Sequence, residues 1–276
     1  MTLISALISK KGIAIATDSM LTAVNKDGSH VYLEGEKSKI VPIPKLNACI
    51  SYWGFAGAQK EIPKDLKNPV WVWQTHSWLR AQSVNPKFSN LEDFTKNLCN
   101  NINKEIKNLG LGNQGIGLHI VGIEEVNGYK IPELFLISNF KDPSYRETGD
   151  LEYSRHTYHT IAGVDPSPDH RQKEYRQEVN RFLNEVGFII YNNGDPIMFN
   201  PFANAFFKSF NEAQRRGVTK SIDAVEDTVP IVRLPIEIVR SIQRNFYKPD
   251  KKLVGGRVHD LSIADNGTMK STSGDI

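Results

Sequence analysis

The chain has 276 residues, of which 39% are hydrophobic and 24% are charged, so it can bury a sizeable core and lacks the composition of a disordered protein. Its formal net charge of +3 is nearly balanced, which gives no support for a nucleic-acid or anionic-membrane partner. The N-terminal apolar run is broken at Lys10 and Lys11, so we expect no signal peptide and no membrane-spanning segment. The apolar settings of Cys49 and Cys99 predict reduced thiols and a cytoplasmic location.

The first elements are predicted to form a β-hairpin. Two apolar runs, residues 2–8 and 13–18, flank a turn at residues 10–12, and both runs are typical of strands. Asp18 therefore lies at the end of the second strand. A further apolar strand is expected at residues 48–51, and a glycine-containing segment follows it directly.

Thr2 is the candidate nucleophile. Removal of Met1 would leave Thr2 with a hydroxyl and a free α-amine at the start of the first strand. Such a residue attacks a carbonyl through Oγ while its own amine, whose ordinary pKa is about 7.7–8.0, accepts the proton. A nearby cation favours the neutral amine and the alkoxide, and a carboxylate must hold that cation. Lys39 and Asp18 can supply these two groups, and a backbone N–H in the segment 52–57 can serve a developing oxyanion.

The middle of the chain predicts two helices followed by strands. Residues 70–84 are expected to form a helix that opens after Pro69, and residues 91–109 a longer amphipathic helix that ends at Gly110. Strands are expected next at residues 116–123, 134–138 and 158–162. This order of strands, helices and strands predicts an α+β fold in which two sheets pack between helical layers.

The rest of the chain is predicted to belong to the same single domain, residues 1–276. It contains a helical insertion around residues 165–219 and ends in a flexible tail from about residue 269. Helices are expected at residues 171–186, 200–216 and 231–246. An aromatic stripe in the second of these is expected to face the core or a partner, with the core favoured. Its members are Phe199, Phe202, Phe206, Phe207 and Phe210.

Several short features stand in a fixed order along the chain. They are Thr2 with an apolar strand, a Lys-Gly turn at 11–12, Ala-x-Asp at 16–18, Lys-x-Lys-Ile at 37–40, Gly-Phe-Ala-Gly at 54–57, and a Gly-Gly, strand and turn at 255–267. In these features, and in the separation of Thr2 from Asp18, the chain resembles the proteasome β-subunit branch of the N-terminal-nucleophile hydrolases, which includes bacterial proteasome-like peptidases. The resemblance implies a four-layer αββα sandwich of two antiparallel sheets.

The resemblance also implies a role for each matched residue. Thr2 is expected to be the nucleophile and its α-amine the base. Lys39 is expected to be the electrostatic activator, Asp18 the group that orients Lys39, and Gly54 the donor of the oxyanion N–H. The implied function is a threonine-type peptidase or amidohydrolase that acts on a peptide or protein after removal of Met1. Implied partners are further copies of the chain, in a ring or stacked assembly, and an ATP-dependent unfoldase.

Supporting positions depart from the family pattern. Ala162 or Val164 stands where proteolytic members have a serine, and residues 251–254 replace an Asp-x-x-Ser stretch, with Asp250 one position early. Ser19 stands where an arginine often follows the first aspartate. Because the missing groups help to position the threonine and its amine, the alternative is a catalytically silent scaffold or shell subunit of an oligomeric assembly.

The candidate catalytic residues also have structural explanations. Thr2 can be an ordinary strand residue that keeps Met1, and Asp18 with Lys39 can be a buried structural ion pair. Their combination with Gly54 and the closing double glycine favours the catalytic interpretation.

Other sequence motifs are poorly suited to binding a cofactor or a metal ion. The Gly-x-Gly-x-x-Gly sequence at 110–115 follows a predicted helix and precedes a strand, the reverse of the order that dinucleotide binding requires. His156 and His159 would point to opposite faces of a strand, which does not suit a shared metal site. His259 and Asp260 are expected to face apart in the same way and to be structural. We therefore expect no cofactor and no metal.

Overall fold

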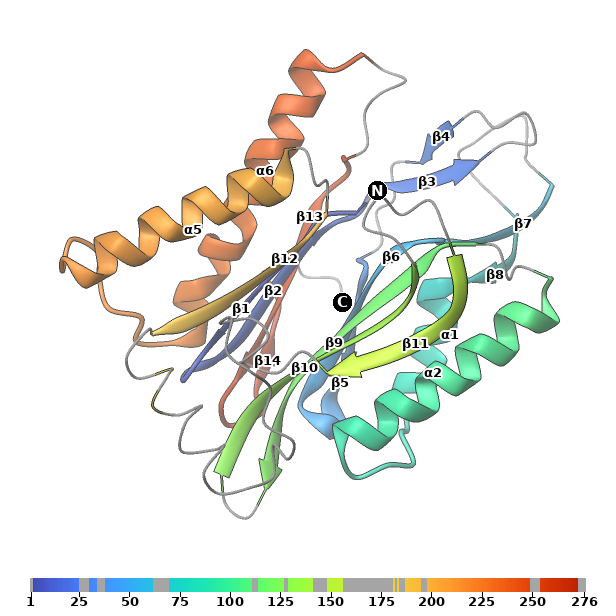
Figure 1. Ribbon diagram of the computed structural model, residues 1–276, viewed down its shortest axis with the longest axis horizontal. Helices are drawn as coiled ribbons and strands as arrows, with labels where there is room; N and C mark the ends of the chain where they lie inside the picture. Colours follow the sequence, from blue (N-terminus) through green and yellow to red (C-terminus); the bar gives the residue numbers. More distant parts are fainter. Residues whose placement is uncertain are drawn as a thin grey trace.

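A computed structural model gives the structure of residues 2–24, 30–33, 38–61, 70–110, 114–126, 129–140, 148–155, 181, 183, 187–194, 198–248 and 254–272. In these residues two five-stranded sheets lie face to face, and helices cover the outer face of each sheet (Figure 1). The neighbouring strands in both sheets run antiparallel. The predicted α+β fold, a four-layer αββα sandwich, is therefore confirmed.

The first sheet contains both strands of the predicted N-terminal hairpin. In spatial order its strands are β12 (Phe188–Asn193), β1 (Ile4–Ser9), β2 (Gly12–Asp18), β13 (Val258–Ala264) and β14 (Met269–Lys270). The hairpin register sets Ile4 opposite Thr17 and Ser9 opposite Gly12. Gly12 has φ +136°, and a Cβ there would lie 2.1 Å from the carbonyl oxygen of Ile263. The hairpin therefore needs glycine at this position.

The second sheet carries the remaining long strands. In spatial order they are β11 (Thr148–Arg155), β10 (Tyr129–Phe140), β9 (Ile116–Val126), β6 (Ala48–Gly54) and β5 (Ile40–Ile43). Two smaller two-stranded sheets pair β3 (Leu21–Val24) with β4 (His30–Leu33), and β7 (Gly57–Glu61) with β8 (Val70–Gln74). The predicted strands at 116–123 and 134–138 are confirmed as parts of β9 and β10, whereas the strand predicted at 158–162 lies outside the described residues.

Helices pack on the outer faces of the two sheets. They are α1 (Thr75–Ser83), α2 (Leu91–Asn108), α5 (Phe199–Arg215) and α6 (Val229–Phe246), with short 3-10 turns η1 (Pro44–Leu46) and η2 (Val225–Thr228). Figure 1 shows α1 and α2 on the second sheet and α5 and α6 on the first. The side chain of Asn90 accepts the N–H of Asp93 and so caps the start of α2, and Gly110 follows its end with φ +68°. The predicted helices at 91–109, 200–216 and 231–246 are confirmed as α2, α5 and α6.

The prediction for residues 70–84 is wrong over its first part. Residues 70–73 alternate valine and tryptophan, which favour a strand, and they form most of β8. The helix begins only at Thr75, whose N–H donates to the carbonyl of Ala56 (3.0 Å) and whose hydroxyl donates to that of Phe55 (2.7 Å). β12 was not predicted either, and it lies within the expected insertion at 165–219, where it pairs with β1. Most of the expected helix at 171–186 lies outside the described residues.

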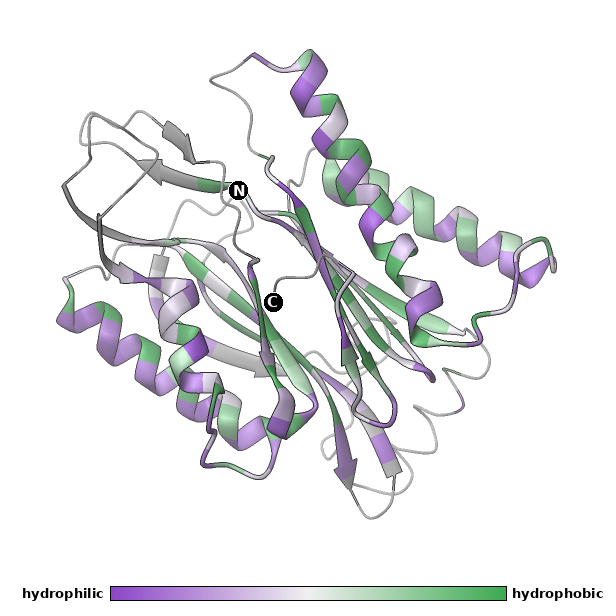
Figure 2. Cartoon of the chain, turned by 180° about the vertical axis from the view of Figure 1, so that it is seen from behind, coloured by the Kyte–Doolittle hydropathy of each residue, from purple (hydrophilic) through white to green (hydrophobic). Residues whose placement is uncertain are grey.

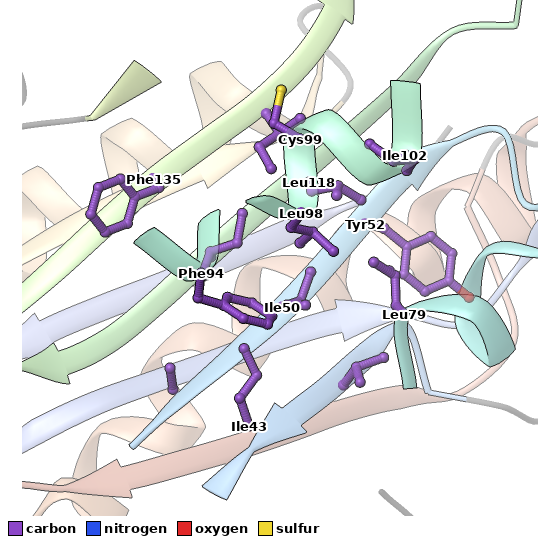
Figure 3. Close-up of a cluster of buried hydrophobic side chains, with 14 of the residues drawn as sticks. Ile43, Ile50, Tyr52, Leu79, Phe94, Leu98, Cys99, Ile102, Leu118 and Phe135 are labelled. Atoms are coloured by element: carbon purple, nitrogen blue, oxygen red, sulfur yellow. The ribbon is translucent and has the colours of Figure 1, made fainter. Parts of the chain in front are cut away.

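The core has three layers, as a four-layer sandwich requires. One lies between the second sheet and α1 and α2 (Figure 3), one lies between the sheets, and one lies between the first sheet and α5 and α6. Figure 2 shows hydrophobic residues concentrated in the sheets and hydrophilic residues along the outward faces of the helices. In the third layer Phe199 and Phe207 are buried, and the rest of the aromatic stripe is partly buried and packs against this layer. No helix among the described residues combines the length and the apolar character that are needed to cross a membrane.

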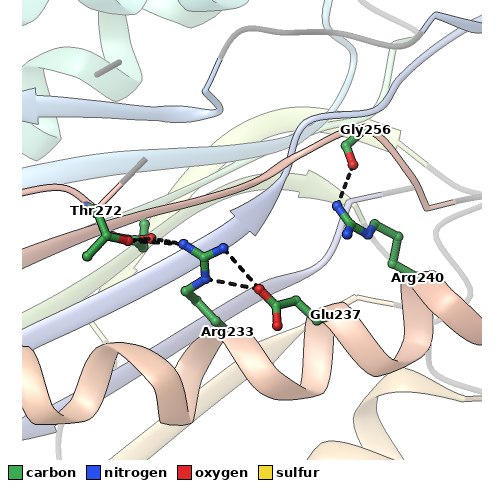
Figure 4. Close-up of polar contacts among 6 residues, drawn as sticks. Arg233, Glu237, Arg240, Gly256 and Thr272 are labelled. Carbon is green, nitrogen blue, oxygen red and sulfur yellow. Dashed lines mark hydrogen bonds and ion pairs between the residues drawn. The ribbon is translucent and has the colours of Figure 1, made fainter. Parts of the chain in front are cut away.

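A buried carboxylate ties α6 to β13 and to the segment after β14. Asp260, which is fully buried, accepts hydrogen bonds from Arg233 Nη1 (2.6 Å) and from the N–H (2.9 Å) and hydroxyl (2.6 Å) of Thr272. The same guanidinium donates to Glu237 Oε1 (Figure 4). These contacts give Asp260 a structural role.

Asp260→Asn is expected to lower the free energy of unfolding by about 1–3 kcal/mol, because it removes a buried carboxylate that accepts hydrogen bonds from Arg233 and Thr272, whereas Arg233 is 27% exposed and keeps Glu237 as a partner. Urea denaturation at neutral pH measures this change. Glu237→Gln is the matched control, since Glu237 contacts the same guanidinium but its side chain is 38% exposed. Its expected cost is below about 1 kcal/mol. Equal costs for the two variants would contradict this account.

Candidate active site

The hairpin β1–β2 brings Thr2 and Asp18 to the same end of the first sheet. The N–H of Asp18 donates to the carbonyl of Leu3 (3.3 Å), and the N–H of Leu3 donates to Asp18 Oδ1 (2.9 Å). These two bonds fix the end of β2 beside the start of β1. Asp18 is fully buried, and Thr2 is 5% exposed. The carboxylate therefore has a defined position next to the first residues of the strand.

Lys39 reaches this position from the second sheet. It directly precedes β5, and its Nζ donates to Thr2 Oγ1 (2.7 Å) and to Asp18 Oδ1 (3.3 Å). The side chain of Lys39 is only 2% exposed. The structure thus brings together three of the four residues that the sequence predicted for the site, and it does so across the interface between the sheets.

Burial and charge act in opposite directions on Lys39. Burial lowers the pKa of its ammonium below the ordinary lysine value, because removal from water disfavours the charged form. The charge of Asp18 and its hydrogen bond raise the same pKa but do not outweigh burial. Tyr52 is also buried here, and burial, followed by the charge of Asp18, raises the pKa of its hydroxyl. The site is therefore a dry environment in which Asp18 is the main partner of the lysine.

Gly54 lies at the end of β6, in the sheet that carries Lys39. Ile40 pairs with Ser51, so the β6 position beside Lys39 is that of Tyr52, and Gly54 lies two residues further along the strand. Gly54 has φ +81°, and a Cβ there would lie 2.3 Å from the carbonyl oxygen of Gly115. The position therefore requires glycine. The register places Gly54 at the same end of the sandwich as Lys39, and its role as an oxyanion donor stays a prediction.

The segment after α6 completes the surroundings of Asp18. The N–H of Gly255 approaches Asp18 Oδ2 at 3.5 Å, and the N–H of Arg257 donates to Ser19 Oγ (2.8 Å). Ser19 thus holds the start of β13. In the sequence this residue stands out only because family members often have an arginine there. Sequence reasoning missed this contact, although a hydroxyl beside the candidate carboxylate was a usable signal. Of the other departures from the family pattern, residues 162, 164 and 250–253 lie outside the described residues, whereas Val254 is described and is buried.

Other reactive groups in the described chain are poorly placed for catalysis. Burial raises the pKa of the Cys49 thiol, and burial with the charge of Glu152 raises that of Cys99 to about 11, so both thiols stay protonated. Among the described residues no three His, Cys, Asp or Glu side chains form a group that could hold a metal ion. The candidate metal ligands His156 and His159 lie outside those residues.

A cavity of about 470 Å³ lies away from Thr2, at the other end of the hairpin. Ser9, Lys10 and Lys11 line it on one side, and Gln214 and Arg215 at the end of α5 line it on another. Since Ser9 ends β1 and Thr2 precedes it, the length of the strand separates this cavity from the lysine and carboxylate. It is not part of the candidate active site.

Three comparisons with known proteins were made, against family models, curated proteins and solved structures. No family model matches the chain, and no curated protein matches it. Among solved structures, the chain is similar to an Anbu mutant from Hyphomicrobium sp. strain MC1, with 12% sequence identity and a TM-score of 0.49 over 100% of this chain and 88% of that one. A likeness this weak adds nothing to what the strands, helices and side chains show directly.

Asp18→Asn is expected to lower the pKa of Lys39 further, because the carboxylate is the group that favours its charged form. In the wild-type protein this pKa already lies below the ordinary value of about 10.4. NMR titration of the lysine side-chain Cε and Nζ resonances measures both values. Glu212→Gln, which removes an exposed carboxylate paired with Arg216, is the control and leaves Lys39 unchanged. An unshifted or raised Lys39 pKa in Asp18→Asn would contradict this electrostatic account.

Proposed function

We propose that the chain, after removal of Met1, is an N-terminal threonine hydrolase of amide bonds that acts on peptides or proteins. The observation that carries this proposal is the 2.7 Å hydrogen bond from Lys39 Nζ to Thr2 Oγ1, with Asp18 Oδ1 3.3 Å from the same nitrogen. A hydroxyl that accepts from a buried cation is prepared for conversion to an alkoxide.

The reaction begins with attack of Thr2 Oγ on the carbonyl carbon of the substrate. A bond forms between Oγ and that carbon, the carbonyl electron pair moves to its oxygen, and the hydroxyl proton moves to the α-amine of Thr2. Collapse of this intermediate breaks the C–N bond, and the amine passes its proton to the leaving group. Water then attacks the ester, the amine takes the proton of the water, and cleavage of the ester returns a proton to Oγ.

Lys39 serves this cycle as a fixed positive charge. Its hydrogen bond stabilises negative charge on Oγ, and its proximity to the α-amine disfavours the ammonium form of that amine. Asp18 holds the lysine in place and opposes the loss of its proton on burial. The low dielectric of the buried site strengthens both effects.

The proposed oxyanion donor is the N–H of Gly54. Its position at the end of β6, two residues along the strand from the point beside Lys39, supports this role because it lies at the same end of the sandwich as the lysine. A preorganised backbone donor of this kind typically contributes a factor of about 10²–10³ to the rate.

The proposal includes the assembly and location that the sequence resemblance implies. We propose a cytoplasmic homo-oligomer, in a ring or stacked arrangement, that takes a peptide or protein substrate, with an ATP-dependent unfoldase as a partner. The alternative is a catalytically silent scaffold subunit of the same fold. The absence from the sequence of the supporting serine and Asp-x-x-Ser groups favours that alternative, whereas the contact of Lys39 with Thr2 favours the enzyme.

An electrophile that forms an adduct with N-terminal threonine is expected to label the protein once Thr2 is the first residue. The chain is produced behind a cleavable N-terminal domain, and a protease releases Thr2. Intact-mass and peptide-mass measurements are expected to show one adduct on Thr2. The uncleaved fusion has the same side chains but no free amine, so it is expected to react slower by a factor of about 10²–10⁴, the usual contribution of a general base.

Two variants complete this test. Thr2→Ala is expected to lose the adduct, and Thr2→Ser to keep it, because serine retains the hydroxyl and the amine. Intact-mass measurement of the protein from its native expression host is expected to show loss of Met1. Equal labelling of wild type and Thr2→Ala, or Met1 retained in the native protein, would favour the scaffold function.

A further inference from the structure

We propose that α6 acts as a clamp that positions the Asp18 carboxylate, with Arg240 and Gln243 as positioning residues for the reaction. The clamp acts through the backbone of residues 254–257. This inference rests on the proposed function, because it concerns the geometry of the same site. The hydrogen bonds of Arg240 and Gln243 that form the clamp run to the backbone of residues 254–257, so their proposed effect on the reaction is indirect.

Two side chains of α6 hold the segment from its helix side. Arg240 Nη1 donates to the carbonyl of Gly256 (2.7 Å; Figure 4), and Gln243 Oε1 accepts the N–H of Val254 (3.0 Å). Gln243 is fully buried. A hydrogen bond from a guanidinium is charge-assisted and about twice as strong as a neutral one. The two contacts fix the distance of the segment from α6 and its direction as the chain passes from α6 to β13.

The same segment contacts the candidate site on its other side. The N–H of Gly255 approaches Asp18 Oδ2 (3.5 Å), and the N–H of Arg257 donates to Ser19 Oγ (2.8 Å). Contacts with α6 and with the end of β2 therefore alternate along four consecutive residues. A displacement of the segment away from α6 or toward it changes the distance from Gly255 to the carboxylate.

The glycines allow this close approach. Gly256 has φ +70°, a conformation that side chains disfavour. A Cβ on Gly255 would lie 2.8 Å from the sulfur of Met20, which follows the Asp18-Ser19 pair. At Gly255 the segment thus passes close to the side chain of Met20. Glycine also gives the segment little stiffness of its own, so contacts from outside must fix its position.

The two oxygens of Asp18 are held by different parts of the molecule. Oδ1 accepts from the N–H of Leu3 and from Lys39 Nζ, whereas Oδ2 faces the N–H of Gly255. The second contact opposes rotation of the carboxylate about its Cβ–Cγ bond. Rotation would move Oδ1 away from Lys39 and would change the position of the ammonium relative to Thr2 Oγ1. Through this chain of contacts, loss of the Arg240 bond is expected to slow the chemical step.

The test uses the released protein and the threonine-directed electrophile, with Arg240→Met as the variant. Methionine keeps most of the length and packing of the side chain but removes the guanidinium. Arg244→Met is the matched control, because Arg244 lies on the same helix, four residues further, and is exposed. Adduct formation is followed at several electrophile concentrations, which separates the rate constant at saturation from the half-saturating concentration.

Arg240→Met is expected to lower the rate constant at saturation about tenfold or more, since small displacements of a reacting group are costly, while the half-saturating concentration stays near that of wild type. Arg244→Met is expected to match wild type in both quantities. Arg240→Lys, which keeps a cationic donor, is expected to recover part of the rate. A purely structural role would lower the melting temperature of Arg240→Met and leave the saturating rate constant of its folded fraction unchanged, and this result would overturn the clamp.

The outcomes for the clamp and for the proposed function are separable. If the wild-type protein forms no adduct, the proposed function is contradicted, and the clamp, which rests on it, is contradicted as well. If the wild-type protein forms the adduct and Arg240→Met has the same saturating rate constant, the clamp is contradicted and the proposed function is not. Should Arg240→Met fail to fold, Arg240→Gln, which is polar but too short to reach the Gly256 carbonyl, is judged by the same rate constant.

Discussion

The ion pair between Lys39 and Asp18 is the constraint on which the rest of the site depends. Both side chains are almost completely buried, and burial of two charges costs several kcal/mol per ion unless their geometry and hydrogen bonds compensate. Lys39 directly precedes β5 of the second sheet and Asp18 ends β2 of the first, so the pair forms only when the two sheets pack in one register. The apolar layer between the sheets, which includes Ile15 and Val121, sets that register. Core packing and placement of the Thr2 hydroxyl are therefore parts of one arrangement.

The sequence predicted those parts of the fold and site that depend on local patterns. The hairpin follows from two apolar runs around Gly12, and α2 follows from regular apolar spacing between Asn90 and Gly110. Placement of Thr2 and Asp18 together followed from that hairpin alone, because a hairpin brings the start of its first strand to the end of its second. The approach of Lys39 came from chemical need and from family resemblance, since sequence patterns do not give the packing of two sheets.

The parts that the sequence did not predict depend on contacts between distant segments. β12 is a short strand whose neighbour β1 is at the start of the chain, and β8 adjoins the start of α1, so its tryptophans were taken into the helix. The role of Arg240 could not be predicted from the sequence either, because a charged residue on an amphipathic helix is normally solvated. Its contact with Gly256 exists only because the chain returns from α6 to the first sheet at that point.

The cost of burying Lys39 bears on the choice between the proposed catalytic role and a purely structural one. A buried ion pair is often replaceable by apolar side chains of similar volume without loss of stability, so stability alone gives a fold little reason to keep one. Here burial lowers the pKa of the lysine, and its ammonium still donates to the hydroxyl of Thr2. A scaffold subunit needs no such bond, because apolar side chains at positions 18 and 39 together could fill the same space between the sheets. A buried titratable group with a lowered pKa that contacts a potential nucleophile is instead typical of sites that do chemistry.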